Sequence, residues 1–503
     1  MKSLVSGLLH EPLADAAQQA IFRPWITDAF AAVLPHLTQV NQAHLVMLVD
    51  RGLMDAPSAA TLLRAIAGLQ GEGPAAFAID ASLEDVYFNY EAELIRSVGQ
   101  GIGGRVHMAR SRNDLQSTLD RMRARRNAML LLEEVCSLRA ALLAKAERFS
   151  DCVMPGYTHL QHAQPITFGF YLLGIEQSLQ RDTRRLFEAH ETINRCPLGA
   201  GALAGTTFAI DREQTARLLG FDGAVPHALD AIASKDAIQQ LLVAGMFLSI
   251  SFGRMAQDFY QMSTYESGML ELPDSLAITS SIMPQKKNQA VLEFVKGRQS
   301  HVLGAIVTAF GAFRGTPFSH VLDGNADSLQ WAWPTLDGLA SLLPVVRLVV
   351  EGAEPQPERM RHLAAANFST ATDLADFLVG TLGLAFKDAH HVTGRIVRLA
   401  LERGLLPGQV DAGLVAEASM QALGREIAIP DATLATVLDP ARAVERRVGC
   451  GGPSASDTAA LARAAGECLS RDRRCVSELE QAARHATREL DERVQALIAS
   501  AAH

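Results

Sequence analysis

The feature that most constrains the fold is a helical periodicity sustained over about forty residues in the middle of the chain. From Arg112 to about Ser150, apolar residues recur every three or four positions, with arginines between them. Similar patterns cover roughly 165–195, 233–264, 288–313 and 328–352. Helices of about 25 to 40 residues far exceed the usual length of about 11–12, and a bundle buries them most readily. Strict heptads are not sustained, so the patterns predict an all-α bundle rather than a coiled coil.

Shorter helical patterns flank the bundle, and little of the sequence favours strands. We predict an N-terminal helical domain over 1–109, the long-helix bundle over 110–355, and a C-terminal helical domain with an extended helical tail over 356–503. The glycine-rich stretch 449–456 predicts a flexible break before one or two terminal helices.

Charge and composition indicate which classes of partner and which cellular location the protein has. The formal net charge is −9 and long basic runs are missing, which argues against a nucleic-acid-binding protein. The N-terminal segment is too interrupted by charge for a signal peptide, and no run of about 18 apolar residues predicts a membrane span. Six scattered cysteines without CxxC spacing indicate reduced thiols in a cytoplasmic protein with no metal site.

One loop combines groups that suit catalysis. The stretch "TSSIMPQKKNQ", residues 279–289, brings adjacent hydroxyls and two lysines together ahead of an apolar run. Such a loop can hold a carboxylate and activate a serine oxygen. It can equally be a solvated connection, because Pro284 stops any helix that enters it.

Two polar segments flank the first long helix. In 107–120, Ser111, Arg112 and Asn113 stand where the helix begins, which suits carboxylate binding or a cap with Asp114 as its acid. In 154–165, Pro155 and Gly156 predict a turn presenting Thr158 and His159, and Pro165 is expected to open the next helix.

A third segment, 197–213, contains glycines that allow close backbone approach or tight helix packing. All three polar segments fall at predicted helix ends. A bundle can gather such ends into one site.

Together these segments resemble the fumarase/aspartase superfamily, and specifically its argininosuccinate lyase branch. The resemblance is carried by "SSIMPQKKN", "RSRND", "PGYTHLQHAQP" and "GALAGTTFAIDRE", and it extends over about residues 80–455. It implies a three-domain all-α fold and a homotetramer whose bundle helices form the core. It also implies sites shared between three subunits, elimination of fumarate from a substituted succinate, and no cofactor or metal.

The resemblance also implies roles for individual residues. Ser280 would remove the Cβ proton, and Lys286 would help to activate its hydroxyl and, with Asn288, hold the substrate carboxylate beside it. His159, oriented by Glu293, would assist the leaving amine. The residues implied to hold the succinyl part are Ser111, Arg112, Asn113, Thr158, Ser281, Met283 and Asn288.

The segment that would contact the leaving amine departs from the branch pattern. In "TPFSHVLDGNADS", His320 stands for a tyrosine, Asn325 for a glutamine, and Leu322 and Ser328 for lysines. Tyr87 stands where a histidine is common. Losing two lysines does not suit the α-carboxylate of arginine.

The retained fumarate chemistry with a rebuilt amine pocket resembles the members that cleave ethylenediamine-N,N'-disuccinate (EDDS). We therefore predict that small aminocarboxylate as substrate, with His320, Asn325 and Tyr87 as further contacts. Argininosuccinate is the second candidate, and a non-catalytic, crystallin-like structural role is the third.

Overall fold

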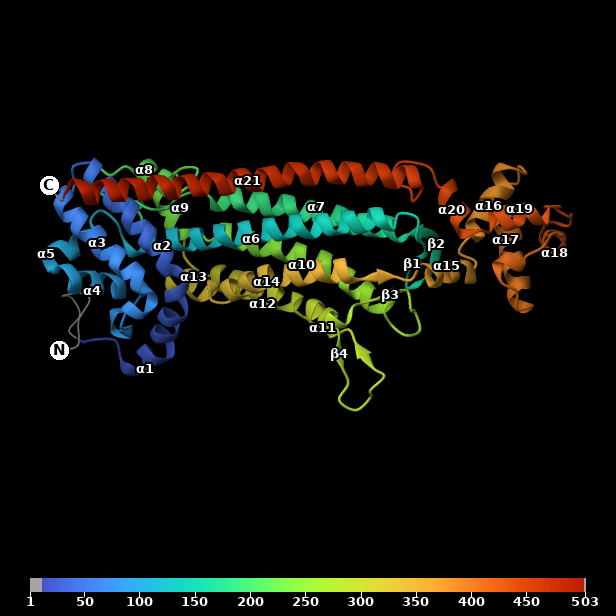
Figure 1. The fold of residues 1–503 in the computed structure, drawn as a ribbon, viewed down its shortest axis with the longest axis horizontal. Helices are drawn as coiled ribbons and strands as arrows, with labels where there is room; N and C mark the ends of the chain where they lie inside the picture. Colours follow the sequence, from blue (N-terminus) through green and yellow to red (C-terminus); the bar gives the residue numbers. More distant parts are fainter. Residues whose placement is uncertain (1–10, 502–503) are drawn as a thin grey trace.

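The structure, a computed structural model, describes residues 11–501 and is predominantly helical, which confirms the all-α prediction (Figure 1). The prediction about a signal peptide falls partly on residues 1–10, which lie outside the described part. The molecule is elongated, with a central bundle and a group of shorter helices at each end.

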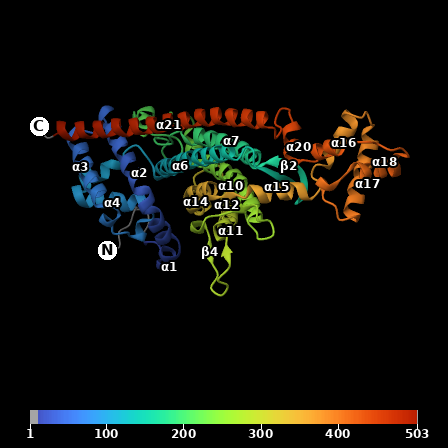
Figure 2. The same ribbon diagram turned by 45° about the vertical axis from the view of Figure 1, so that its right-hand side comes forward.

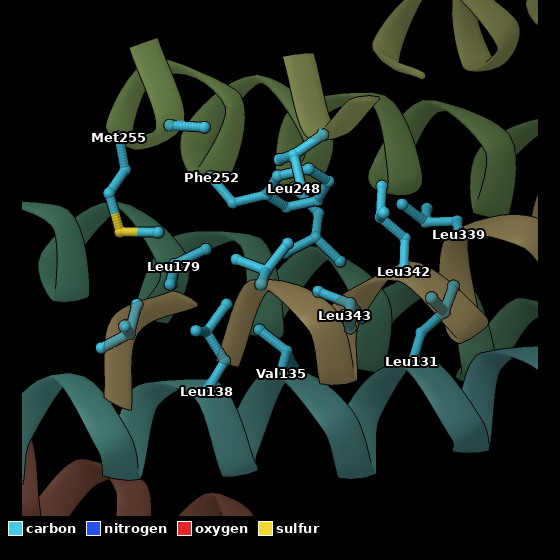
Figure 3. Close-up of a cluster of buried hydrophobic side chains, with 14 of the residues drawn as sticks. Leu131, Val135, Leu138, Leu179, Leu248, Phe252, Met255, Leu339, Leu342 and Leu343 are labelled. Atoms are coloured by element: carbon cyan, nitrogen blue, oxygen red, sulfur yellow. The ribbon is translucent and has the colours of Figure 1, made fainter. Parts of the chain in front are cut away.

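The central bundle contains the long helices that the periodicity predicts. Its elements are α6 (Arg112–Arg148), α7 (Phe168–Ile193), α10 (Asp236–Met262), α11 (Ala290–Gly297), α12 (Gln299–Phe313) and α14 (Ala332–Gly352). The pattern over 288–313 is thus divided into α11 and α12 at Arg298. In Figure 3, Leu138 of α6, Leu179 of α7 and Phe252 of α10 interdigitate, together with Leu343 of α14. Apolar faces of four helices therefore share one core.

Within residues 11–501, two helical stretches are long and apolar enough, by length and composition alone, to cross a membrane: Asp236–Met262 and Leu322–Gly352. From the sequence we expected no such stretch. In the first, 67% of the most apolar window is buried inside the protein, as expected for a core helix. In the second, 44% is buried, and Trp331 and Leu348 are exposed. An exposed apolar face of this kind suits a subunit interface.

The N-terminal helices enclose a second hydrophobic core. The longest of them, α2 (Arg23–Asp50), has 28 residues and contains Pro35, so it is longer than the short helices predicted for this region. It continues a π-helical turn, η1 (Gln18–Phe22). The other elements are α1 (Asp15–Ala17), α3 (Ala56–Glu72), η2 (Gly73–Ala76), η3 (Ala81–Leu83), α4 (Val86–Val98), α5 (Gln100–Gly103) and η4 (Gly104–His107).

A third hydrophobic core lies at the opposite end of the molecule, within the C-terminal helices. These helices are α15 (Pro357–Ala366), α16 (Ala371–Gly380), α17 (Phe386–Glu402), η7 (Pro407–Gln409), α18 (Ala412–Leu423), α19 (Asp431–Val437) and α20 (Pro440–Arg446). Shorter elements between the bundle helices are α8 (Arg212–Leu218), α9 (Ala228–Ala233), η5 (Asp274–Leu276), α13 (Leu322–Asn325) and η6 (Asp327–Leu329).

The predicted terminal tail is one continuous helix, α21 (Ala455–Ser500), of 46 residues. It runs from the C-terminal helices back along α6 and α7 to α2 and α3 (Figures 1 and 2). Leu469 and Val476 join the bundle core, whereas Leu490 and Val494 join the N-terminal core. The tail therefore links both cores.

Within residues 11–501, three small antiparallel sheets lie between the helices. They are β1 (Val153–Thr158) with β2 (Gln161–Thr167), β3 (Leu270–Glu271) with β6 (Glu354–Pro355), and β4 (Ile278–Thr279) with β5 (Lys287–Asn288).

The first sheet corrects the prediction for residues 154–165. Pro155 pairs with Pro165 inside the hairpin, so neither residue makes a turn or opens a helix. The turn lies at His159 (φ 52°) and Leu160 (φ 58°), both left-handed, as a two-residue hairpin connection of type I′ requires. The helix α7 begins only at Phe168, after a cap by Thr167.

A buried ionic cluster fastens α21 to the bundle. Arg139 on α6 is fully buried and donates to Glu176 on α7 (Nε–Oε1 2.8 Å) and to Asp472 on α21 (Nη1–Oδ2 2.5 Å). Glu176 is itself fully buried, and burial raises its pKa. Asp472 is partly exposed, whereas the charges of Arg139 and Glu176 stay inside the protein only because they are paired.

Replacement of the guanidinium should therefore be costly. We expect Arg139→Met to lower the free energy of unfolding by about 3–5 kcal/mol, because Glu176 would remain buried without its partner. Arg184→Met is the control, since Arg184 pairs with Glu188 on the surface, and it should change the free energy by less than about 0.5 kcal/mol. Urea unfolding followed by circular dichroism measures both. Equal midpoints for the two variants would contradict this account.

Candidate active site

The start of α6 is a capped helix end joined to the glycine-rich segment 197–213. The Ser111 side chain accepts a hydrogen bond from Asn113 N (3.3 Å), and Asp114 accepts one from Ser111 N (2.9 Å), so the predicted cap is present. Asp114 also accepts from Gly199 N (2.9 Å) and Gly201 N (2.8 Å). Burial raises the pKa of Asp114 to about 6. One carboxylate thus holds two of the predicted segments together.

The glycines of this segment allow the close approach that the sequence predicts. Gly201 has φ +64°, and a Cβ atom there would lie 2.5 Å from the carbonyl oxygen of Gly205. Asn113 Nδ2 donates to the carbonyl oxygen of Ala202 (3.1 Å). The segment therefore folds tightly against the first turn of α6.

A cavity of about 390 Å³ opens beside the start of α6; we call it the α6 cavity. It gathers five of the residues predicted as substrate contacts, from α4, from α6 and from the chain around α13. They are Tyr87, Arg112, Asn113, His320 and Asn325.

The α6 cavity also includes residues that the sequence analysis did not assign. Glu84 and Asp85 precede α4, and Gln116 follows on α6. Phe22 and Trp25 come from the π-helical turn and the first turn of α2. The wall is thus partly acidic and partly aromatic.

Arg112 is held by the acidic pair. Its Nη1 lies 3.0 Å from Glu84 Oε2 and 3.1 Å from Asp85 Oδ2, and its guanidinium lies 4.4 Å from the ring centre of Phe88. Burial raises the pKa of Asp85, which also caps α4 by accepting from Phe88 N (2.7 Å). Glu84 has φ 71°, a conformation that is strained for a residue with a side chain.

Two other side chains that line the cavity have hydrogen-bonding capacity left. Asn325 donates through Nδ2 to the carbonyl oxygen of Val321 (2.8 Å), while its buried Oδ1 has no partner among the described residues. His320 likewise has a buried Nδ1 without a partner within residues 11–501. Burial, with Lys235 and Arg112 nearby, lowers the pKa of His320 to about 4, so its imidazole is neutral at pH 7.

Tyr87 closes this wall from α4. Its hydroxyl donates to Glu91 Oε1 (3.0 Å) and accepts from Arg110 Nη2 (3.4 Å). Burial raises the pKa of Tyr87 above its usual value, so the phenol is neutral at physiological pH.

The serine loop lies elsewhere. Residues 280–286 connect β4 to β5, and both views show this loop standing clear of the bundle (Figures 1 and 2). Ser280 Oγ accepts from Met283 N (3.1 Å), and the side chains of Ser281, Met283 and Lys286 are exposed. Lys287 anchors the base of the loop through Asp274 (2.8 Å).

Two other assigned residues follow the loop. Asn288 ends β5 and is half-buried. Glu293 on α11 accepts a hydrogen bond from Tyr260 Oη (2.9 Å). Its partner within one chain is thus Tyr260 rather than His159.

Thr158 and His159 occupy the exposed tip of the β1–β2 hairpin, beyond the far end of α6. With 37 residues, α6 is about 55 Å long, and Arg112 is its first residue. One chain therefore joins segments 107–120 and 197–213, but it does not bring the hairpin tip to them. Within one chain, the bundle thus brings together only these two of the segments among the described residues.

Within residues 11–501, no group of three or more His, Cys, Asp or Glu side chains is placed to hold a metal ion. All six cysteines are free thiols.

Comparisons with known proteins identify the family. A sequence model described as lyase matches residues 17–304, and one described as argininosuccinate lyase C-terminal matches residues 368–445. Argininosuccinate lyase 1 of Shouchella clausii is 35% identical to this chain, covering 95% of it and 96% of the relative. The chain belongs to this lyase family. Argininosuccinate lyase of Methanothermobacter thermautotrophicus is also 35% identical, over 83% of this chain and 88% of its own.

Solved structures agree with the family assignment. The crystal structure of EDDS lyase in complex with formate has a TM-score of 0.89 at 32% identity, covering 99% of this chain and 97% of that one. A 3-carboxy-cis,cis-muconate lactonizing enzyme from Pseudomonas putida, at 18% identity and a TM-score of 0.69, shares the fold over 92% of this chain and all of its own. The protein is a carbon–nitrogen lyase that releases fumarate.

Proposed function

We propose that this lyase cleaves N-succinyl amines, first among them EDDS, and that it releases fumarate stepwise in the cytoplasm. The observation that carries the proposal is the α6 cavity, where His320, Leu322 and Asn325 occupy the wall. Argininosuccinate lyases resemble one another in placing a tyrosine, a lysine and a glutamine at these positions. The similarity to EDDS lyase over nearly the whole chain supports the same substrate.

Ser280 is the proposed base. It takes the Cβ proton, the electron pair moves into the neighbouring carboxylate as an aci-carboxylate dianion, and the C–N bond then breaks to give fumarate and the amine. A serine hydroxyl needs strong local help to act at neutral pH. Lys286, loop amide groups and the exclusion of water on binding would supply that help. His159 would assist the departing amine.

We further propose a homotetramer whose sites combine parts of three chains. The α6 cavity, the serine loop and the hairpin tip lie at separate places in one chain, so a complete site requires neighbours. A groove of about 520 Å³ between α10, α12 and α14 exposes an apolar face that includes Trp331. Burying this face between bundles would form the tetramer core.

Mixed tetramers test the shared site. We expect the inactive variants Ser280→Ala and His159→Asn, refolded together in equal amounts, to regain up to about a quarter of the parental activity, because some sites receive both intact residues from different chains. Mass spectrometry of differently tagged subunits verifies the mixing, and each variant refolded alone is the control. Verified hybrids without recovery would place both residues in one chain.

An amine panel tests the reaction itself. The protein is incubated with fumarate and single amines, and the ultraviolet absorbance of fumarate reports addition. Consumption with ethylenediamine supports the proposal. If arginine is the one amine in the panel that leads to fumarate consumption, the second candidate, argininosuccinate, is favoured. The 35% identity to argininosuccinate lyases is the reason to test it.

A further inference from the structure

We propose that the α6 cavity selects leaving amines that carry a second positive charge, so that mono-N-succinyl diamines are its best substrates. This inference rests on the proposed function and names the class of amine that the same site takes.

Two residues that line the cavity, Asn325 and His320, each contain a buried polar atom without a partner among the described residues. Asn325 is only 4% exposed, and its Nδ2 is committed to Val321, which leaves Oδ1 without a partner within residues 11–501. Buried polar atoms in folded proteins almost always find partners. A carbonyl oxygen can bond only a donor, such as the N–H of an ammonium group. The neutral His320 can likewise accept a hydrogen bond on one ring nitrogen.

The balance of charge points the same way. Glu84 and Asp85 share the single guanidinium of Arg112, so this part of the wall contains more carboxyl groups than cations. Lys235, the cation near His320, is neutralised by Asp120 (Nζ–Oδ2 3.1 Å). Glu84 also keeps its strained backbone at the cavity wall, and such strain concentrates at functional sites.

An aromatic surface completes the cation site. Phe22 and Trp25 line the cavity with their rings 6.4 Å apart, and the π-helical turn that carries Phe22 contacts η3, the element just before Glu84. Ammonium groups bind favourably over indole faces. π-Helical turns also occur often at functional sites.

The same wall disfavours an anionic arm. No lysine lines the described cavity, and its one arginine is already paired. From EDDS, the first elimination must expel an amine that bears two carboxylates, whereas the second expels ethylenediamine. We therefore expect the second elimination to be the faster one, without accumulation of the mono-succinyl intermediate.

Three substrates of matched size test the inference in the elimination direction: N-(3-aminopropyl)aspartate, N-butylaspartate and N-(2-carboxyethyl)aspartate. Fumarate release by the full-length enzyme should give a kcat/KM at least about tenfold higher for the aminopropyl than for the butyl compound, and lowest for the carboxyethyl compound. If the butyl or the carboxyethyl compound has a kcat/KM equal to or higher than that of the aminopropyl compound, this inference is overturned, whereas the proposed function stands. No fumarate from any of the three overturns the proposed function as well.

Single variants test whether residues of the α6 cavity cause the preference for the aminopropyl compound. Glu84→Gln should bring the aminopropyl-to-butyl ratio of kcat/KM close to one, and Asn325→Asp should raise it. Glu93→Gln is the matched control, because Glu93 lies outside the cavity and pairs with Arg96, so the ratio should not change. An unchanged ratio in Glu84→Gln overturns the inference. If that variant fails to fold, an unchanged or lower ratio in Asn325→Asp overturns it instead.

Discussion

Ser280→Ala should lower turnover by about a hundredfold to ten-thousandfold, the range expected when a positioned base is lost. The hydroxyl lies on a loop that stands clear of the bundle and bonds only loop amides, so its removal leaves every hydrophobic core intact. The variant should therefore fold and assemble like the parent. Fumarate release at saturating EDDS, with size-exclusion chromatography in parallel, measures both properties.

Ser281→Ala is the matched control for this variant. It changes the adjacent exposed hydroxyl of the same loop, and we expect it to retain most of the parental turnover. The reverse result, with Ser281→Ala inactive and Ser280→Ala active, would move the proposed base to Ser281.

The second large effect concerns the choice between EDDS and argininosuccinate. Argininosuccinate carries a carboxylate at the far end of its amine arm, and no lysine is among the described residues that line the α6 cavity. A buried polar group without its partner costs about 1–3 kcal/mol, and more when it is charged. The kcat/KM for argininosuccinate should therefore lie several powers of ten below that for N-(2-aminoethyl)aspartate, the mono-succinyl product of EDDS, whose amine arm carries no carboxylate. Comparable values in the unmodified protein would return the chain to the function of its curated relatives.

Restoring lysine should narrow this gap, but only at one of the two positions. Leu322 and Ser328 both stand where the argininosuccinate lyase branch has lysines. Leu322 is 51% exposed at the cavity wall and can accept a lysine, whereas Ser328 is fully buried and donates to the carbonyl oxygen of Gly324 (2.7 Å). A lysine at 328 would bury an unpaired charge and destabilise the protein. Leu322→Lys is thus the informative variant, and an unchanged ratio between the two substrates would count against this explanation.

The long helices were predictable because apolar periodicity records which face is buried. The hairpin at 153–167 was not predictable, because its prolines and glycine are typical of turns. In the structure they lie within paired β-strands. Pro155 and Pro165 are tolerated there because they face each other in a sheet of only two strands, where each strand is an edge. The continuity of α21 was also unclear from sequence, since its many charges suit one exposed helix or two.

Only some of the contacts in the site could be predicted from the sequence. The cap at Ser111 follows from a local pattern, and the cavity contacts followed from resemblance at single positions. Glu84 and Asp85 were visible as an acidic pair before Tyr87, yet nothing local indicated that they would hold Arg112. Trp25 gave no signal at all, because an aromatic residue in an apolar helix usually belongs to a core. Such contacts depend on packing between elements that are distant in sequence.

The long return path of α21 has a consequence for biosynthesis. Leu490 and Val494 complete the core built by the first hundred residues, and Arg493 pairs with Asp50. At about 5–20 residues per second, a ribosome needs on the order of a minute to add these last side chains after the first domain emerges. Until then, part of the apolar core of the N-terminal helices lacks these covering side chains. The earliest residues of the chain therefore reach their final packing only after residue 494 has emerged from the ribosome.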